Sequence, residues 1–392
     1  MRIAIDGTTL CAPDGSRGAG VEHYSWSIVN ALIRLRTEHR FIIAVPPGFS
    51  SVRRAQLEAV GDHVRIMRCP FSKPSALARH AFMPLHVALY RPDALFCPHG
   101  QIPFGWLGRS VVTIHDLSIY DHPEWFPDMQ DVSIRLLVPR SLTRAVKVIA
   151  VSNATHFALQ RLFPITNGKT VVVHEGVDVE EAYQALKDAN WESRRFPFDR
   201  DFVLCLGTIE PRKNLVHAVK AFDAFLCAHP EQATQVRLVL AGKRGWKTQD
   251  TEAEVTRVNR TWKSSEPAGV IQMLGTVTQE EKWHLLARAS CLLFPSYEEG
   301  FGLPVLEAMA VGTPVIASAI DALQEVGGDA AMYVEPTDVE GMSFALTQCL
   351  LVPEGTRELK EAGLIRVAGF TWERAANETL KVLEDVSKTK TT

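Results

Sequence analysis

The segment DFVLCLGT (201–208) restarts, near the middle of the chain, a pattern that RIAID (2–6) begins at the N-terminus. Each segment begins with a short apolar run, and a glycine (Gly7 or Gly207) and then a polar loop follow that run. Such runs are typical of strands buried on both faces of a parallel sheet. VEHYSWSIVNALIRL (21–35) follows the first run and AVKAFDAFL (218–226) the second, with apolar residues at helical spacing.

Ten further apolar runs are predicted to be strands. They are FIIAVP (41–46), VRIMRCP (64–70), ALFCP (94–98), SVVTIHD (110–116), KVIAVS (147–152), KTVVVHEG (169–176), VRLVLAG (236–242), VIQMLGTV (270–277), CLLFPS (291–296) and TPVIAS (313–318). Their alternation with helices predicts an α/β protein with two Rossmann-like, doubly wound parallel-sheet domains. Functional loops are then expected at the carboxyl ends of the strands, with the two domains facing a central cleft.

The chain of 392 residues is long enough for two domains. The irregular, polar stretch near 180–200 is interpreted as the linker region. The expected division is therefore an N-terminal domain over 1–185, a C-terminal domain over 186–368 and a final helical segment over 369–392.

Bulk composition restricts the function classes. Apolar residues make up 46% and charged residues 22%, as in a globular protein, and no apolar run approaches the roughly 20 residues that span a bilayer. The N-terminus shows no secretion signal, and the seven scattered cysteines have no metal-type spacing. We therefore expect a cytoplasmic protein with reduced thiols.

Charge is distributed unevenly along the chain. The net charge of −3 argues against general nucleic-acid binding. Residues 1–195 hold 22 basic and 18 acidic residues (+4), whereas residues 196–392 hold 20 and 27 (−7). Residues 1–100 alone hold 12 basic and 7 acidic residues. This excess is consistent with peripheral contact of the first half with an anionic membrane, or with an ordinary solvated surface.

A dinucleotide-binding fold is tested by the loop after the first strand. It would need GxGxxG there, but the sequence offers only Gly18-Ala-Gly20 without a third glycine. NAD binding is therefore not expected. The two glycines instead allow the loop to lie against a ligand, or simply mark a flexible turn.

The segment EEGFGLPVLEAMAVG (298–312) predicts a turn that opens a helix. Pro304 suits the first helical turn, and Gly300 and Gly302 allow a ligand to approach bare backbone. The amides expected to donate at this positive helix end are those of Phe301, Gly302 and Leu303.

Two acids, Glu299 and Glu307, flank this turn. Beside an anion site they make sense if they accept hydrogen bonds from sugar and ribose hydroxyls. In GTIEPRKNL (207–215), Arg212 and Lys213 follow the strand that ends at Gly207, and together they could neutralise a diphosphate. Taken alone, such a basic pair is more often a solvated surface.

These motifs resemble the signature series of the retaining nucleotide-sugar glycosyltransferases of family 4, which have the GT-B fold. The resemblance rests on the Glu299-x7-Glu307 spacing and on several blocks in order. These are GAGVEHY (18–24), IHDLSIYDHPEWFP (114–127), VSNAT (151–155), HEGVD (174–178), GTIEPRKNL (207–215), AGKRGW (241–246), LGTV (274–277), PSYEEGFGLPVLEAMAVGTPVIAS (295–318) and FTWERAA (370–376). The last block resembles the helix that crosses back onto the N-terminal domain.

The resemblance implies a role for each matched position. Arg212 and Lys213 would grip the donor diphosphate, Glu299 would hold the transferred sugar, and Glu307 would accept the ribose hydroxyls. The other implied donor-binding residues are Gly20, Gly207, Leu274, Gly275, Val277, Gly300, Phe301, Gly302 and Leu303. Many members carry Arg where this chain has Thr208, so the contact made by Arg212 departs from the usual pattern.

In the first half, His115 resembles the family histidine that contacts the transferred sugar, although a histidine satisfied within its own domain is the alternative. Gly18, His99 and Asp116 are candidates on the acceptor side. Ser152 is interpreted as a helix N-cap.

The resemblance implies transfer with retention and without a cofactor, and front-face substitution is the favoured mechanism. No DxD-type metal site is evident, since charge neutralisation is assigned to side chains, so no metal requirement is expected. The donor is expected to be GDP-mannose, and the acceptor a glycan or lipid-linked oligosaccharide. UDP-glucose, UDP-galactose or an N-acetylhexosamine donor are alternatives. A nucleotide-sugar 2-epimerase and a non-catalytic sugar-nucleotide binding protein are the rival classes.

Overall fold

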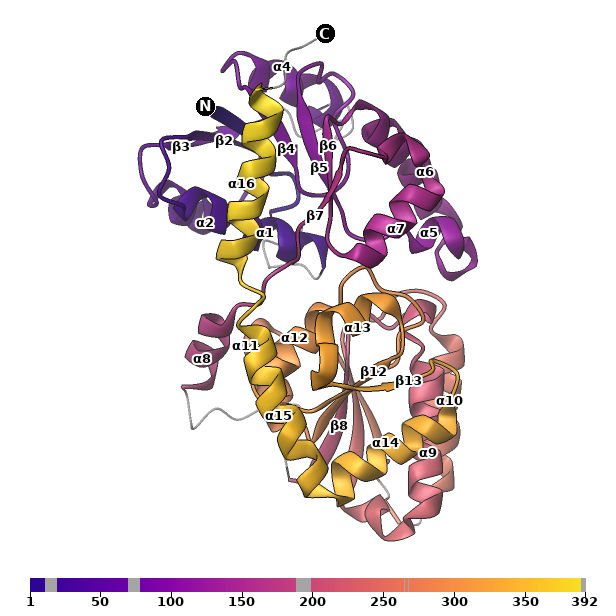
Figure 1. The fold of residues 1–392 in the computed structure, drawn as a ribbon. Helices are drawn as coiled ribbons and strands as arrows, with labels where there is room; N and C mark the ends of the chain where they lie inside the picture. The colour runs from indigo at the N-terminus through magenta and orange to yellow at the C-terminus, as the bar shows by residue number, and fades with distance from the viewer. Residues whose placement is uncertain (11–19, 70–77, 188–198, 264, 267, 389–392) are drawn as a thin grey trace. The chain divides into compact units, whose positions relative to one another are not determined.

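A computed structural model describes residues 1–10, 20–69, 78–187, 199–263, 265, 266 and 268–388. The chain forms two compact units. The first consists of residues 1–120, 128–176 and 371–392, and the second of 121–127 and 177–370. Each unit contains one parallel sheet with helices packed against it (Figure 1).

The first unit has a seven-stranded sheet in the order β3-β2-β1-β4-β5-β6-β7. All neighbouring strands are parallel. The strands are β1 (Arg2–Asp6), β2 (Arg40–Val45), β3 (Val64–Arg68), β4 (Ala94–Cys97), β5 (Ser110–Ile114), β6 (Lys147–Ala150) and β7 (Thr170–Val172). The helices are α1 (Val21–Arg34), α2 (Ser51–Glu58), η1 (Ala78–Phe82), α4 (Met83–Ala88), α5 (Ser118–Asp121), α6 (Asp128–Arg144), α7 (Asn153–Leu162), η3 (Pro164–Thr166) and α16 (Trp372–Lys388).

The second unit has a six-stranded parallel sheet in the order β10-β9-β8-β11-β12-β13. The strands are β8 (Asp201–Leu206), β9 (Val236–Ala241), β10 (Ile271–Gly275), β11 (Cys291–Phe294), β12 (Val315–Ser318) and β13 (Met332–Val334). The helices are η2 (Pro123–Trp125), α8 (Val179–Leu186), η4 (Pro211–Lys213), α9 (Leu215–Ala228), η5 (Pro230–Thr234), α10 (Gln249–Thr261), α11 (Gln279–Arg288), α12 (Leu303–Ala310), α13 (Asp321–Gly327), η6 (Gly328–Ala330), α14 (Val339–Leu351) and α15 (Pro353–Val367).

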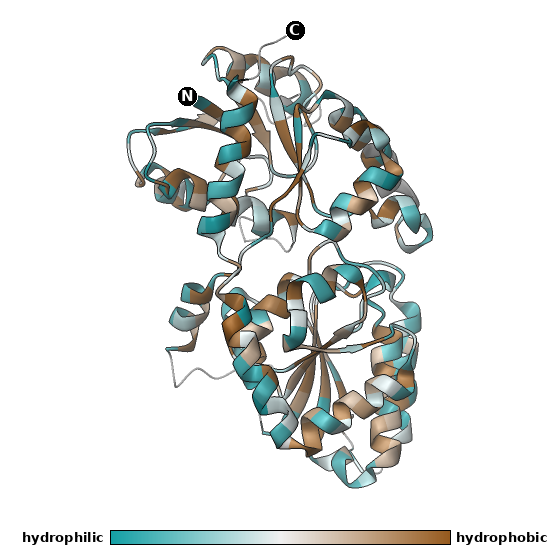
Figure 2. Ribbon diagram, in the orientation of Figure 1, coloured by the Kyte–Doolittle hydropathy of each residue, from teal (hydrophilic) through white to brown (hydrophobic). Residues whose placement is uncertain are grey.

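The expected fold class is confirmed. Buried strand residues form the interior of each unit, and the helices present polar residues outward (Figure 2). The central strands β1, β4 and β8 are buried almost throughout, as their continuous apolar sequences predict.

The chain passes from one unit to the other at positions that differ from the expected domain limits. The change between units falls at Gly176/Val177, so α8, which the limit at 185 left in the N-terminal domain, packs with α11 and α12 of the second unit. Residues 121–127 also belong to the second unit. After Phe370 the chain returns to the first unit, where α16 packs on α1. No helix in the described part of the chain is both long and apolar enough to cross a membrane.

Candidate functional site

At the carboxyl edge of the second sheet, the backbones of neighbouring strand ends lie very close together. A Cβ on Gly242 would lie 1.9 Å from the carbonyl oxygen of Gly207, so only glycine allows these two strand ends to meet. The amide of Gly242 in turn donates to the carbonyl of Gly275 at 2.9 Å. A Cβ on Gly275 would meet nothing within 4 Å. The ends of β8, β9 and β10 therefore form one bare edge that a ligand can approach.

Arg212 and Lys213 lie on the short helix η4 directly after β8. Arg212 Nη1 donates to Glu299 Oε2 at 2.8 Å, and Lys213 Nζ donates to Glu299 Oε1 at 2.5 Å. Arg212 Nη2 donates to Glu210 Oε1 at 2.9 Å. All four side chains are at most 13% exposed. Two cations and two carboxylates thus form a buried cluster with no net formal charge, and Glu299 joins the two basic residues.

The environment fixes the charge of Glu299. Burial opposes ionisation of this carboxyl, but the charges of Arg212 and Lys213 outweigh burial and hold its pKa at about 2. Burial lowers the pKa of Lys213 despite the opposing effect of Glu299. Burial raises the pKa of Glu210 despite its basic neighbours. Glu299 is therefore a carboxylate, and a hydrogen-bond acceptor only, at every physiological pH.

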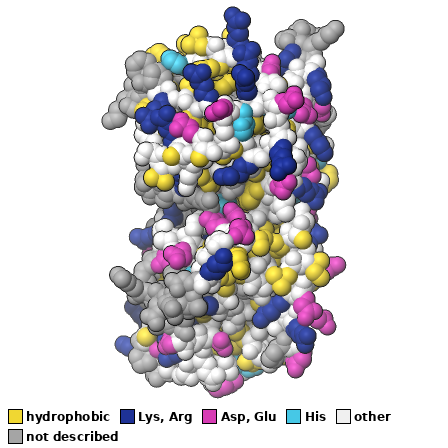
Figure 3. Space-filling model, turned by 90° about the vertical axis from the view of Figure 1, so that its left-hand side faces the viewer, with side chains coloured by type: hydrophobic (Ala, Val, Ile, Leu, Met, Phe, Trp, Pro, Cys, Tyr) yellow, Lys and Arg dark blue, Asp and Glu magenta, His cyan; other side chains and the backbone are white. Residues whose placement is uncertain are grey.

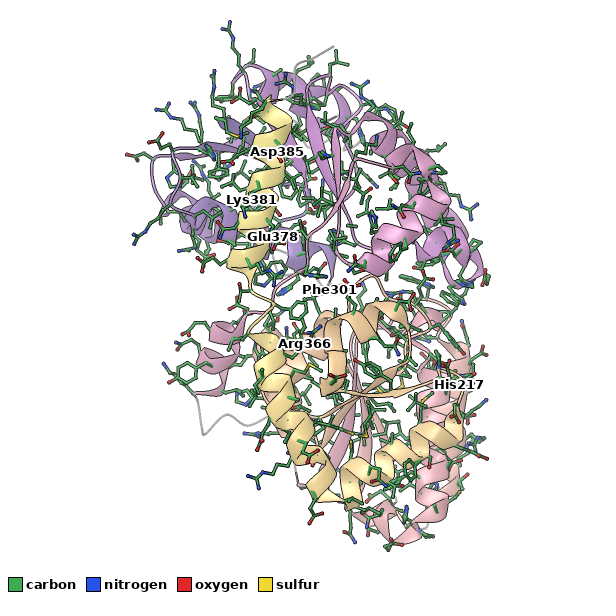
Figure 4. The ribbon with its side chains drawn as sticks, in the orientation of Figure 1. His217, Phe301, Arg366, Glu378, Lys381 and Asp385 are labelled. Atoms are coloured by element: carbon green, nitrogen blue, oxygen red, sulfur yellow. The ribbon has the colours of Figure 1, made fainter. Side chains whose placement is uncertain are left out.

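The turn before α12 requires a glycine. Gly302 has φ of +108°, and a Cβ there would lie 2.5 Å from Leu323 Cδ2. Phe301, labelled in Figure 4, is buried beside it. Its ring meets that of Phe370 edge-on, with ring centroids 6.0 Å apart. Pro304 occupies the first helical turn, as predicted. The positive end of α12 therefore lies directly after Glu299, held by packing on both sides.

Glu307 lies one turn into α12 and is 6% exposed. Its Oε1 accepts a hydrogen bond from Lys282 Nζ of α11 at 2.5 Å. Lys282 is itself buried, and its ammonium lies 4.4 Å from the ring centroid of Trp283. The sequence reading placed Glu307 in the site but did not identify Lys282 as its partner. Lys282 lies on the apolar side of α11 with Leu285 and Leu286. A lysine at such a position is unusual, and this could have indicated that Lys282 has a buried acidic partner.

An aromatic stack, also missed from the sequence, supports the Arg212–Glu299 cluster. Trp125 of η2 stacks on Tyr297, with ring centroids 5.7 Å apart and an interplanar angle of 20°. The amide of Tyr297 donates to the carbonyl of Arg212 at 2.9 Å. Trp246 Nε1 donates to the carbonyl of Trp125 at 2.6 Å. Residues 121–127, which come from the N-terminal half of the sequence, thereby hold the loop that carries Glu299.

Apart from Gly20, which lies in the first unit, the sequence-predicted donor residues share one edge of the second unit. Leu274, Gly275 and Val277 lie at or just after the end of β10, next to Gly242 through the backbone hydrogen bond above. Leu303, the first residue of α12, and Gly300 flank the Gly302 turn. No group of His, Cys, Asp and Glu suited to a metal ion occurs among the described residues.

In the first unit, His115 follows β5 and has both ring nitrogens engaged within that unit. Nε2 lies 2.8 Å from the carbonyl oxygen of Pro98, and Nδ1 lies 3.2 Å from Glu175 Oε1. Two acceptors match an imidazolium that donates from both nitrogens. Burial alone would lower the pKa of His115, but Glu175 outweighs it and raises that pKa. The alternative of a histidine satisfied inside its own domain describes this arrangement.

The other first-unit candidates have varied surroundings. His99 Nε2 lies 3.0 Å from Asp6 Oδ2, and the guanidinium of Arg79 lies 3.1 Å from His99 Nδ1. Asp116 accepts from the hydroxyl and amide of Ser118 at the start of α5. Gly20 is the N-cap of α1, with φ of +60°.

Two further first-unit residues, Gly18 and Ser152, were also predicted from the sequence. Gly18 lies outside the described residues. Ser152 caps α7 as predicted, because its hydroxyl accepts from the amide of Thr155 at 3.0 Å.

Parallel α/β units with a strand-end site of cations, carboxylates and a helix N-terminus define an enzyme of the GT-B class, and comparisons with known proteins agree. Residues 187–366 match the family model "Glycosyl transferases group 1", and residues 18–181 match "Glycosyltransferase Family 4". The O-antigen chain mannosyltransferase B of Escherichia coli is 30% identical over 294 residues, 74% of this chain and 73% of that protein. This chain belongs to the family 4 glycosyltransferases and is itself a glycosyltransferase.

More distant comparisons are consistent with this assignment. The O-antigen chain mannosyltransferase RfbU of Salmonella typhimurium is 25% identical over 65% of this chain and 64% of its own length. Among solved structures, sucrose-phosphate synthase from Thermosynechococcus elongatus aligns with a TM-score of 0.71 at 21% identity, covering 98% of this chain and 99% of that chain. At that identity the likeness shows the fold alone.

Proposed function

We propose that this chain transfers mannose from GDP-mannose to a hydroxyl of a growing glycan or lipid-linked oligosaccharide, with retention and without a metal ion. The Arg212–Glu299–Lys213 cluster at the start of α12 carries this proposal. The names of the relatives as O-antigen mannosyltransferases support the choice of sugar. The basic first hundred residues support peripheral membrane contact.

The proposed step is a front-face substitution. The acceptor hydroxyl oxygen bonds to the anomeric carbon of the donor on the face from which the nucleoside diphosphate leaves. The bond between that carbon and the diphosphate oxygen breaks, and its electron pair stays with the diphosphate, which takes the hydroxyl proton. Arg212, Lys213 and the helix end stabilise the charge that develops on the leaving group.

The acids have a role in the same step. Because Arg212 and Lys213 both donate to Glu299, a diphosphate bound between them shares these donors with the carboxylate. The Glu299 carboxylate, ionised at neutral pH, can then accept hydrogen bonds from hydroxyls of the transferred sugar. Glu307 accepts the ribose hydroxyls while Lys282 keeps its carboxylate oriented.

Donor choice is tested by the unfolding temperature of the purified protein with GDP, UDP, GDP-mannose and UDP-glucose. A ligand at 100 times its Kd stabilises the folded state by about 2.7 kcal/mol. We expect GDP and GDP-mannose to raise the unfolding temperature and the uridine compounds to leave it unchanged. Stabilisation by UDP-glucose alone would replace mannose by glucose in the proposal.

The reaction is tested with GDP-mannose and a mannose-terminated oligosaccharide. We expect an α-linked product by NMR and unchanged turnover in EDTA. A β-linked product would contradict retention, and loss of activity in EDTA with recovery on adding a divalent cation would contradict metal independence. Conversion of the donor to its 2-epimer in the absence of an acceptor would instead indicate an epimerase.

A further inference from the structure

One surface of the first unit combines exposed apolar side chains with basic residues. It is formed by η1 and α4, the segment 98–109 between β4 and β5, and the end of α6. Its exposed apolar side chains are Leu85 (62% exposed), Leu89 (76%), Phe104 (51%), Leu107 (81%) and Leu136 (66%). We refer to these five side chains and the arginines around them as the apolar–basic face.

The elements of this face are one continuous layer. Their inner side chains, including Met83 and Val87 of α4, Trp106, and Val138 and Leu142 of α6, belong to a single buried core against the seven-stranded sheet. With these residues buried beneath it, the outer side of the same layer carries the exposed leucines. The apolar–basic face is therefore the outer surface of a well-packed layer.

Contacts within the layer join its three parts. The amide of Gly105 donates to the carbonyl of His80 at 2.7 Å, which holds segment 98–109 against η1. The guanidinium of Arg140 lies 4.1 Å from the ring centroid of Phe104, and its Nη2 donates to the Phe104 carbonyl at 2.9 Å. Leu136 lies one turn before Arg140 on α6. The exposed apolar side chains thus lie on adjoining elements.

Within the three segments that form this face, the formal charges have one sign. Segments 78–91, 98–110 and 132–147 contain 14, 13 and 16 residues, 43 in total. They hold seven basic residues and no Asp or Glu, although the whole chain has 45 acids in 392 residues. The basic residues are Arg79, Arg91, Arg109, Arg135, Arg140, Arg144 and Lys147. On a different side of this unit, the side of α2 and β3 in Figure 1, basic and acidic side chains are mixed (Figure 3).

We propose that the apolar–basic face docks this chain on an anionic lipid bilayer. Exposed leucine and phenylalanine side chains can enter the acyl boundary, while arginines attract acidic head groups. The absence of acids in these three segments removes the like-charge repulsion that acidic lipids would otherwise meet. This localises the membrane contact of the proposed function to one surface of the first unit.

The position of this face suits a lipid-linked acceptor. Arg79 of η1 is at one end of the layer, and its guanidinium lies 3.1 Å from Nδ1 of His99, an acceptor-side candidate. The layer thus extends from the carboxyl edge of the first sheet, where an acceptor is expected, across the outside of the unit. A lipid-anchored acceptor in the same bilayer would then be near His99.

The test is flotation of the purified full chain with phosphatidylglycerol-containing vesicles and with vesicles of phosphatidylcholine alone. We expect binding to the anionic vesicles that weakens as salt is raised. Leu85→Asp combined with Leu107→Asp should lower the bound fraction at least about tenfold, because two exposed leucines that would enter the acyl boundary are replaced by charges that anionic lipid repels.

The matched control is Phe344→Asp combined with Ile365→Asp, which changes two side chains of similar exposure (66% and 78%) on α14 and α15. It should bind vesicles like the unaltered chain. Equal binding by both double variants, or no binding by the unaltered chain, would overturn the proposal. A dimer in solution that the Leu85→Asp, Leu107→Asp variant dissociates would also overturn it, by showing that the face contacts a second copy.

The unfolding temperature of both double variants with GDP separates this inference from the proposed function. We expect the stabilisation by GDP to be unchanged, because none of the four substituted residues belongs to the Arg212–Glu299 cluster. Vesicle binding without any nucleotide effect would contradict the donor assignment and leave the docking surface supported.

Discussion

The carboxyl edges of the two sheets hold buried charges in different ways. In the second unit, Arg212 and Lys213 share Glu299, so two basic side chains neutralise one carboxylate. In the first unit, His115 and His99 meet Glu175 and Asp6, so the partners of the buried acids are imidazoles. The two cations keep Glu299 ionised at neutral pH, whereas Glu175 raises the pKa of His115 against the effect of burial, so the charge of His115 depends on pH. This difference fits diphosphate binding at one edge and hydroxyl recognition at the other.

The largest expected effect is the removal of a cation from the second unit. Arg212→Ala or Lys213→Ala should lower turnover by on the order of 100–1,000-fold, because each removes a donor that stabilises the leaving diphosphate. The measurement is steady-state release of GDP from GDP-mannose with acceptor present. Arg357→Ala, an 82% exposed arginine on α15, is the matched control and should retain activity.

The same variants test whether the diphosphate binds at Arg212 and Lys213. Near-normal turnover of Arg212→Ala in a protein whose unfolding temperature is unchanged would show that the diphosphate binds elsewhere. A corresponding removal of the His115 ring should not give a loss of this size if His115 serves its own domain.

A smaller effect is expected at the Glu307–Lys282 pair. Glu307→Gln should weaken GDP binding about 10- to 100-fold, since hydrogen bonds to a charged group contribute about 1.5–3 kcal/mol. The same substitution should change the affinity for 2′,3′-dideoxy-GDP little, because this analogue lacks the ribose hydroxyls. Titration calorimetry with both nucleotides measures the difference.

Lys282→Met should reduce the preference for GDP over its dideoxy analogue, because Glu307 loses the partner that orients its carboxylate. Glu340→Gln, an exposed acid in the first turn of α14, is the control. An equal loss of affinity for GDP and its dideoxy analogue would contradict the ribose role, because the acid would then support the fold of the site rather than the sugar.

Much of the second-unit site could be predicted from the sequence, because its residues lie in short segments at strand ends. A strand followed by glycine and a basic pair places Arg212 and Lys213 at the carboxyl edge, and Gly302 with Pro304 fixes the start of α12. The sequence could not show that Glu299 joins both cations, because that contact spans 86 and 87 positions and depends on how β8 and β11 pair.

Tertiary packing explains the other differences. The edge strand β13 has only three half-buried residues, so its sequence has too little pattern to identify it. Lys282 reaches Glu307 only because α11 packs on α12. Residues 121–127 join the second unit although the chain on both sides belongs to the first, which no local pattern encodes.

A still smaller effect is expected from the aromatic stack. Trp125→Ala should lower turnover by up to about tenfold, since an aromatic pair contributes about 0.5–1.5 kcal/mol and Tyr297 holds the loop that carries Glu299. Trp125→Phe keeps a ring and should recover most of the activity. A loss confined to the KM for the acceptor, with GDP affinity unchanged, would show that this segment does not position the donor loop.

The smallest effect is a pH dependence that separates the two edges. The pKa of His115 is raised by Glu175 against the effect of burial, so its contribution to stability is complete below the unfolded pKa of 6.5 and is lost as pH rises through the folded pKa. Glu299 has a lowered pKa of about 2, so its contribution is present above 4.5 and is lost only as pH falls toward 2. Between pH 6 and 9 Glu299 should therefore add no pH dependence. The unfolding temperature of His115→Gln should approach that of the unaltered chain as pH rises through this range. A difference between the two proteins that stays constant from pH 6 to 9 would mean that His115 is held neutral, and that its contacts with Glu175 and Pro98 do not depend on a charge.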